Sequence, residues 1–389
     1  MSTSVMDHDR RAAIVSLHFS CSHASHIMAY GKLLRELGFA VSFVLEERYL
    51  AFEDSFAIED TISGRGYCNN PGTQQFDLVV FYNSAVKNHS LASALRERGT
   101  TVLYVFHEPE PINSLSVLRS EGLKKTVRFV LSSLFSIRTT CTSSAVIVCS
   151  SYGRALYDRG YQRFNSNVHV LPLLFDDEIG QELFEQMRSH KRYLGFVGTA
   201  CKSHGFDVFV EFAKYALRNG SDIPFVIATW VDLSSLLQSD QELAGFVEQG
   251  RIRMQHGRRL SNDEINQHYM ECFCIWNVYR RSTQSGVLPR SFMAGTPVLA
   301  SRVGSFPEEV QPGFTGEFVD VNEDPAAILA TVQNLRAHTA DYFDECRKRF
   351  LEKFYFRANR NQLTEILEST SISKSIAKTI PTGTHQRRA

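Results

Sequence analysis

Several features that mark other classes of protein are missing from this 389-residue sequence. No apolar run approaches the roughly 18–20 residues that a membrane-spanning helix needs. The eight cysteines contain no Cys-x-x-Cys pair, so we expect reduced core cysteines in a cytosolic protein, without disulfides or a zinc site. The 42 basic side chains balance the 42 acidic ones, so the net charge gives no indication of a nucleic-acid partner.

The length of the chain fits two domains of ordinary size. Short apolar runs that favour strands alternate with helical patterns through the first half, and the alternation starts again at Tyr193–Gly198. This pattern predicts an α/β fold with two doubly wound, Rossmann-like parallel sheets. A helical pattern covers Asp341–Leu367. The predicted divisions are a first domain at 1–175, a second at 176–350, a last helix at 351–368 and a disordered Ser/Thr/Lys-rich tail at 369–389.

The segment Cys274–Gly304 is the most informative part of the chain. It predicts a strand, a polar turn with a glycine, a short helix, a tight turn and a second strand. Ser285 and Gly286 stand directly before the helix, where unpaired backbone N–H groups and the helix dipole can hold an anion. Gly295, followed by Thr-Pro, is a pattern that ends a helix. The alternative interpretation is an ordinary connection of any Rossmann-like domain.

The same segment resembles the donor-binding element of the GT-B glycosyltransferases, in particular the retaining group known as family four. The resemblance implies two Rossmann-like domains facing each other across a cleft. The acceptor domain comes first, the donor domain second, and the last helix crosses back to the first domain. It also implies that the turn and helix hold the diphosphate and ribose of a nucleotide sugar. The residues concerned are Gln284, Ser285, Gly286, Val287 and Arg290.

Two positions depart from the family pattern. Family four commonly carries two glutamates eight residues apart, and in this chain Ser282 and Arg290 stand at those positions. An arginine reverses the charge of a glutamate and cannot accept a hydrogen bond from a hydroxyl group. Either the ribose and sugar are held differently, or the activity has been lost. Arg290 is still a candidate for the donor site because it adds positive charge. Arg280 and Arg281 also add positive charge to this segment.

The turn after the first strand of the second domain resembles the start of the family's donor domain. Gly198 and Gly205 supply its two glycines. Thr199 stands where the family has an arginine, and His204 stands where it has a lysine. We expect Lys202 to supply the cation that balances a diphosphate. The alternative is a solvated lysine on an ordinary loop.

The segment Gln255–Leu260 resembles the loop that edges the nucleobase in the same family. The resemblance makes Gly257 and Arg258 candidates for base contacts. Ser261, with Glu264 three residues later, predicts a capping box at the start of the following helix.

Histidines mark two places in the first domain. The first strand–helix turn contains three histidines and no glycine, and His18, Ser22 and His23 are its acceptor-side candidates. A metal site is disfavoured there because no carboxylate is interleaved. His107 and Glu108 follow a buried strand, at the end where doubly wound sheets bind ligands.

The resemblance implies that His107 contacts the transferred sugar, and we expect Glu108 beside it to hold the imidazole protonated. The alternative is a partly buried histidine bonded to a neighbouring loop. Further along, residues 122–138 mix cations with a wide apolar face. That pattern is typical of a helix on a membrane surface and equally of a core-facing surface helix.

The resemblance implies a hexosyltransferase-type glycosyltransferase that moves a sugar from a nucleotide-diphosphate donor to a saccharide or lipid-linked saccharide. It implies anomeric retention, a role in polysaccharide or glycoconjugate biosynthesis, and no metal or cofactor. The expected location is the cytoplasm, at the inner face of the plasma membrane. Two alternatives stay open: a nucleotide-sugar epimerase of the same fold, and a degenerate partner subunit without activity. A dehydrogenase is disfavoured because no Gly-x-Gly-x-x-Gly follows the first strand of either domain.

Overall fold

The computed structural model describes residues 10–20, 23–51, 60–69, 74–109 and 123–370. The chain forms two compact units. The first unit takes the described parts of 1–149, 154–174 and 359–389, and the second takes 150–153 and 175–358. Both are α/β, so the predicted fold class is confirmed. None of the described helices is long and apolar enough to cross a membrane.

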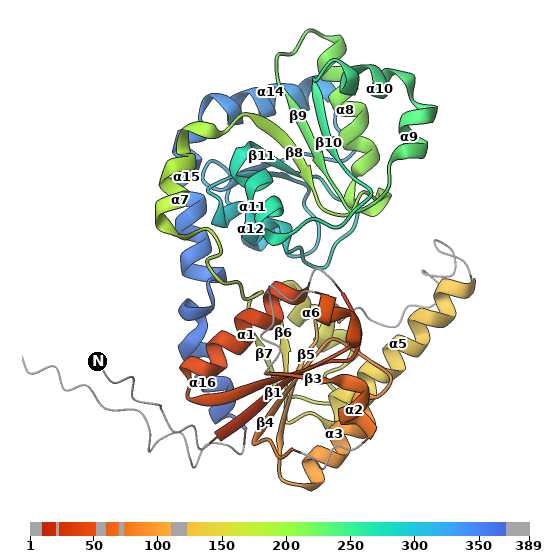
Figure 1. Cartoon of the computed structure of the whole chain (residues 1–389), viewed down its shortest axis with the longest axis vertical. Coiled ribbons are helices and arrows are strands. Elements are labelled where there is room, and N and C mark those ends of the chain that lie inside the picture. The colour runs from red at the N-terminus through yellow and green to blue at the C-terminus, as the bar shows by residue number, and fades with distance from the viewer. Residues whose placement is uncertain (1–9, 21–22, 52–59, 70–73, 110–122, 371–389) are drawn as a thin grey trace, which may run out of the picture. The chain divides into compact units, whose positions relative to one another are not determined.

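The first unit is built on a seven-stranded parallel sheet with the order β3-β2-β1-β4-β5-β6-β7 (Figure 1). Its strands are β1 (Arg10–Ser16), β2 (Phe39–Leu45), β3 (Thr61–Ser63), β4 (Leu78–Tyr82), β5 (Thr101–Val105), β6 (Ala145–Val148) and β7 (Val168–Val170). Its described helices include α1 (Ala24–Glu36), α2 (Gly64–Asn69), α3 (Asn88–Glu97), α5 (Leu123–Thr142), all but the first turn of α6 (Ser151–Gly160), and α16 (Arg360–Glu368).

The central strands of this sheet explain why the sequence alternates as it does. Every residue of β4 and β5 is buried, because helices cover both faces of a parallel sheet and leave no polar side for alternation. β1 pairs with both β2 and β4, so the strand order changes direction between β1 and β4. Ligands of doubly wound sheets bind at such a switch point, outside the carboxyl ends of the strands.

The second unit has a six-stranded parallel sheet with the order β10-β9-β8-β11-β12-β13. Its strands are β8 (Tyr193–Val197), β9 (Phe225–Ala228), β10 (Ile252–Gln255), β11 (Cys272–Asn277), β12 (Val298–Ala300) and β13 (Gly316–Phe318). Its helices include α7 (Gly180–Gln186), α8 (Phe206–Arg218), α9 (Ser234–Ser239), α10 (Gln241–Glu248), α11 (Asn262–Glu271), α12 (Val287–Met293), α13 (Phe306–Glu309), α14 (Pro325–Ala337) and α15 (Thr339–Arg349). The switch point lies between β8 and β11.

Aromatic packing fixes α8 on the second sheet. The rings of Phe209 and Phe212 lie 5.5 and 5.3 Å from the indole of Trp276, which is buried near the end of β11. Aromatic side chains bury large areas and pack in such tilted and offset pairs. The loop between β8 and α8 is therefore held at both of its ends by the core.

The predicted continuous helix over Asp341–Leu367 is wrong in its middle. α15 ends at Arg349, a short π-helical turn follows, and α16 begins only at Arg360. The cause is Phe175, whose backbone N–H donates to Phe354 O at 2.9 Å and whose carbonyl accepts from the N–H of Phe356 at 2.9 Å. Backbone groups used in this bridge cannot bond along a helix.

The last described helix belongs to the first unit. Gln362 donates to the carbonyl of Val170 at 2.6 Å, and Ser369 bonds to the ring of His169 at 3.1 Å. The chain thus enters the second unit at Phe175 and is part of the first again from Asn359. Of the predicted disordered tail at 369–389, all but the first two residues lie outside the described part of the chain.

Candidate functional site

Two loops meet at the switch point of the second sheet. One follows β8 and contains Gly198–Gly205, and the other follows β11 and leads to Gly286 at the start of α12. The backbone N–H of Arg280 donates to the carbonyl of Ser203 at 2.9 Å. This arrangement brings two predicted turns together at one edge of the sheet, namely Gly198–Gly205 and Gln284–Val287.

The two loops approach each other closely at Gly205. Its φ is 64°, a left-handed conformation that side chains disfavour. A Cβ atom at this position would lie 2.0 Å from the carbonyl oxygen of Val278. Beside it, the rings of His204 and Tyr279 stack with centroids 4.3 Å apart. Only glycine therefore lets the two loops pack against each other.

The positive charges at this edge are mostly compensated. Arg280 forms an ion pair with Asp207 at 2.5 Å, a partner that no sequence pattern indicated. Lys202 differs, because its ammonium group is exposed and makes no hydrogen bond or ion pair with any residue that the structure describes. Lys202 is accordingly available to an anionic ligand.

Arg290, at a family glutamate position, is occupied elsewhere. Its guanidinium pairs with the carboxylate of Glu178 at 3.2 Å and donates to the side-chain oxygen of Asn266 at 2.9 Å. Ser282, at the other glutamate position, donates to the carbonyl of Gln284 at 2.8 Å. The two replacements thus bond within the second unit itself.

His204 does not replace the charge of the family's lysine. Its Nδ1 lies 3.2 Å from the carbonyl of Thr199, which can only accept, so Nδ1 carries the proton. Burial lowers the pKa of His204 below its ordinary value, despite this hydrogen bond. The neutral ring keeps Nε2 as a hydrogen-bond acceptor.

The loop after β10 is fixed in place by its neighbours. The N–H of Gly257 donates to the carbonyl of Val231 at 3.1 Å, and the predicted capping box of Ser261 and Glu264 at the start of α11 is confirmed. Arg258 forms an ion pair with the same Glu264. Glu264 thereby connects the loop to the helix cap.

In the first unit, aromatic rings gather where β1, β4 and β5 end. The imidazoles of His23 and His107 stack 4.8 Å apart, and His107 lies 4.4 Å from the ring of Tyr82. Asn83 follows Tyr82 with a φ of 76°, uncommon for a residue other than glycine, and its side chain bonds to Nδ1 of His23 at 2.6 Å. This histidine pair lies at the switch point of the first sheet.

Burial keeps the histidine pair neutral. It lowers the pKa of His23 to about 3 and that of His107 well below its ordinary value, with further lowering by neighbouring histidines. The expectation that Glu108 holds His107 protonated is therefore wrong, because the ring is buried while Glu108 is exposed. Among the described residues, no group of three or more His, Cys, Asp or Glu is arranged to hold a metal ion.

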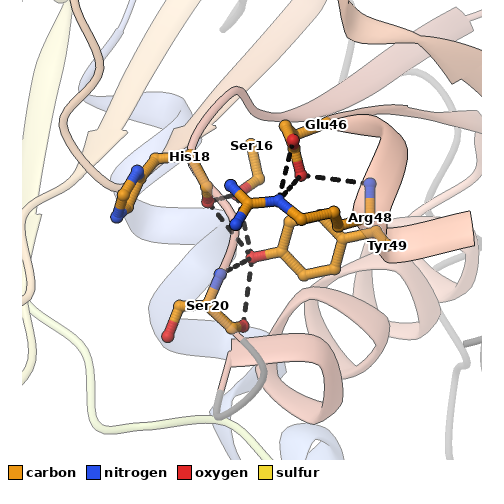
Figure 2. A network of polar contacts seen from close by, with 6 residues as sticks. All are labelled: Ser16, His18, Ser20, Glu46, Arg48 and Tyr49. Carbon is orange, nitrogen blue, oxygen red and sulfur yellow. Dashed lines mark hydrogen bonds and ion pairs between the residues drawn. The ribbon is translucent and has the colours of Figure 1, made fainter. Parts of the chain in front are cut away.

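A tyrosine holds the glycine-free turn after β1. The hydroxyl of Tyr49, which lies in a short turn after β2, accepts from the N–H of Ser20 at 3.1 Å and bonds to Ser20 O at 3.2 Å (Figure 2). The guanidinium of Arg48 covers the ring of Phe19 at 4.9 Å. Figure 2 shows the imidazole of His18 turned away from this network. Ser22 lies outside the described residues.

Several of these contacts have no signal in the sequence. Tyr49, Asp207 and Glu178 lie far along the chain from the groups they bind. The sequence could have indicated Asn83 as a candidate, since it directly follows a buried strand. That strand lies beside the strand that leads to His107. The predicted site residues themselves fall into two groups, one at the switch point of each unit.

Comparison with known proteins identifies the domain and the fold. Residues 191–338 match the family model of Glycosyl transferases group 1. A glycosyltransferase from Rickettsia africae ESF-5 is 13% identical with a TM-score of 0.66, covering 96% of this chain and 100% of its own. HepE from Anabaena, solved in complex with UDP and glucose, is 13% identical with a TM-score of 0.68, covering 92% and 100%. No curated protein matches the sequence.

The two parallel sheets and these structural likenesses define the GT-B fold. The chain is a glycosyltransferase that carries a group 1 domain over residues 191–338 of its second unit.

The contact at Gly205 predicts a specific loss of stability. Gly205→Ala should lower the free energy of unfolding by about 2 kcal/mol or more beyond the effect of Gly250→Ala. Gly250 is the matched control because its φ is 70° but a Cβ there meets nothing within 4 Å. Urea unfolding of both variants measures the difference, and equal losses would show that Val278 moves aside without cost.

The neutral histidine pair predicts an acid-sensitive first unit. Because the folded-state pKa values of His23 and His107 lie below the unfolded value near 6.5, stability is present above pH 6.5 and is lost as the pH falls toward 3. Each ring should contribute up to about 1.4 kcal/mol per pH unit. The double variant His23→Gln/His107→Gln should show a shallower decline between pH 6.5 and 5 in urea unfolding. The exposed His338→Gln serves as control, and an unchanged slope in the double variant would contradict the assignment.

Proposed function

We propose that this glycosyltransferase moves a sugar from a nucleoside-diphosphate donor, bound by the second unit, to a saccharide or lipid-linked saccharide in polysaccharide or glycoconjugate biosynthesis. The observation that carries the proposal is the uncompensated Lys202 on a glycine turn at the switch point between β8 and β11. The complex of the similar HepE with UDP and glucose supports a nucleotide-sugar donor. Retention of the anomeric configuration is part of the proposal.

The diphosphate binds among Gly198, Lys202, Ser285 and Gly286. Gly198 lies next to the start of α12, since a Cβ on it would be 3.7 Å from Cγ2 of Val287. The hydroxyl of Ser285 accepts from the N–H of Val287 at 3.2 Å. Lys202 supplies the charge that stabilises the leaving diphosphate, and no metal takes part.

His107 acts on the transferred sugar as a neutral group. A neutral imidazole has one donor and one acceptor nitrogen, so it can orient a sugar hydroxyl. Its Nδ1 is 3.8 Å from the thiol sulfur of Cys149, and its ring is stacked on His23, which together fix its orientation. His107 thus serves as a positioned hydrogen-bonding group without acting as a nucleophile or a cation.

Incubation of the pure chain with a panel of nucleotide sugars and saccharide acceptors tests the function. Release of free nucleoside diphosphate together with a glycosylated acceptor is the expected result. An isomerised donor would instead identify an epimerase. A folded chain that changes no donor would indicate a partner subunit without activity, consistent with the engagement of Arg290 by Glu178.

Two variants should separate donor binding from transfer. Lys202→Ala should weaken nucleoside-diphosphate binding about 10- to 150-fold, the effect of losing a charge-assisted hydrogen bond. His107→Gln should lower turnover about 10²–10⁴-fold while leaving that affinity unchanged. Calorimetry and transfer rates on the same preparations give both values.

The exposed Lys348→Ala, in the same unit as Lys202, is the charge control. Unchanged affinity in Lys202→Ala would remove that lysine from the site. Full transfer by His107→Gln would make the histidine structural.

Membrane contact through α5 is a further part of the proposal. Leu131 and Leu134 are 48% and 47% exposed, whereas Ser133 and Ser136 on the same helix are buried. An ordinary core-facing helix would bury its leucines and expose its hydroxyls. Arg138 adds an exposed cation to the outer face. A helix that presents leucines and a basic group outward suits an anionic membrane surface.

Vesicle sedimentation tests this contact. The wild type should sediment with anionic vesicles at low salt, and Leu131→Ser/Leu134→Ser should lose most of that binding because the apolar contact is gone. Leu183→Ser, which removes an exposed leucine from the second unit, should bind as the wild type does. Absence of wild-type binding even at low salt would exclude α5 as a membrane helix.

A further inference from the structure

An exposed tryptophan lies at the edge of the second sheet where the strands end. Trp230 comes two residues after β9 and is 55% exposed, whereas Trp276 is buried in the core. Its indole Nε1–H donates to the hydroxyl of Thr199 at 3.2 Å. Among the described residues no aromatic ring or cation stacks on this indole. Trp230 is thus fixed in place while its ring stays open to solvent.

Its neighbours place this ring between two predicted parts of the donor site. On one side, Thr199 belongs to the glycine turn after β8 that is assigned to the diphosphate. On the other side, the loop of Trp230 is bonded to the loop after β10, since Gly257 N donates to Val231 O and Leu233 N donates to the ring of His256. Neighbouring strands are about 4.8 Å apart, so β8 and β10 end roughly 10 Å apart with β9 between them.

A nucleotide that binds its diphosphate at the β8 turn must extend its nucleoside along this edge. The base-contact candidates Gly257 and Arg258 lie on the loop after β10, so the nucleoside is expected to extend toward β9 and β10. A flat, immobilised indole face in that path offers a stacking surface to a nucleobase, and every base has a π face to match it. The hydrogen bond to Thr199 fixes the orientation of the ring in advance, which lowers the entropy lost on binding.

We propose that the indole of Trp230 stacks on the nucleobase of the donor nucleotide. This inference rests on the proposed function and extends it to a residue without a counterpart among the sequence-predicted site residues. Thr199, at the position of the family's arginine, then anchors the tryptophan through its side chain. Because stacking does not distinguish bases strongly, Trp230 contributes affinity for the nucleoside, and hydrogen bonds from other groups select the base.

Calorimetry with UDP, ADP, GDP and inorganic diphosphate tests the proposal. Trp230→Ala should weaken binding of at least one nucleotide about tenfold or more and leave the affinity for inorganic diphosphate unchanged, because only the nucleotide carries a base. Trp230→Phe, which keeps an aromatic face, should stay within a few-fold of the wild type. Phe314→Ala is the matched control, since Phe314 is an equally exposed aromatic of the same unit at 55%.

The possible results separate the two proposals. Unchanged nucleotide affinity in Trp230→Ala overturns the stacking role. Equal weakening of nucleotide and inorganic diphosphate also overturns it, because Trp230 would then act through Thr199 on the phosphate turn. If the wild type binds none of the nucleotides, the proposed donor site itself is wrong, and the role of Trp230 is overturned with it.

Discussion

The contact of two backbone loops at Gly205 is the constraint on which the candidate site of the second unit depends. The loop after β8 and the loop after β11 can approach only because residue 205 has no Cβ and a positive φ. This approach brings Lys202, the turn before α12 and the stacked pair of His204 and Tyr279 to one edge of the sheet. Anion binding at such an edge uses the unpaired backbone N–H groups at helix N-termini.

The two units use different electrostatics at their switch points. In the second unit, Asp207 pairs with Arg280 and Glu178 pairs with Arg290. Few of the described basic side chains at this edge, Lys202 among them, therefore keep an uncompensated positive charge. In the first unit, burial lowers the pKa values of the histidines and leaves hydrogen-bonding groups without charge. Under the proposed function, the exposed cation of the second unit would stabilise a charged leaving group.

Local patterns allowed the fold class, and the turns that carry the candidate residues, to be predicted. Fully apolar runs such as Leu78–Tyr82 read as buried parallel strands, and the Ser261 capping box depends on residues three apart. Contacts between distant residues could not be predicted in this way. Phe175 interrupts the last helix from about 180 positions away, and the partners of Arg280 and Arg290 are set by the tertiary fold. The exposure of Trp230 could not be predicted either, because an isolated tryptophan after a strand resembles any core residue.

A crystal structure of the chain with bound nucleoside diphosphate tests the central claim most directly. The diphosphate is expected to lie within hydrogen-bonding distance of the Lys202 ammonium group and beside the backbone of Ser285 and Gly286. A nucleotide found at the histidine pair of the first unit, or a diphosphate held by Arg290 after its ion pair with Glu178 has opened, would contradict it.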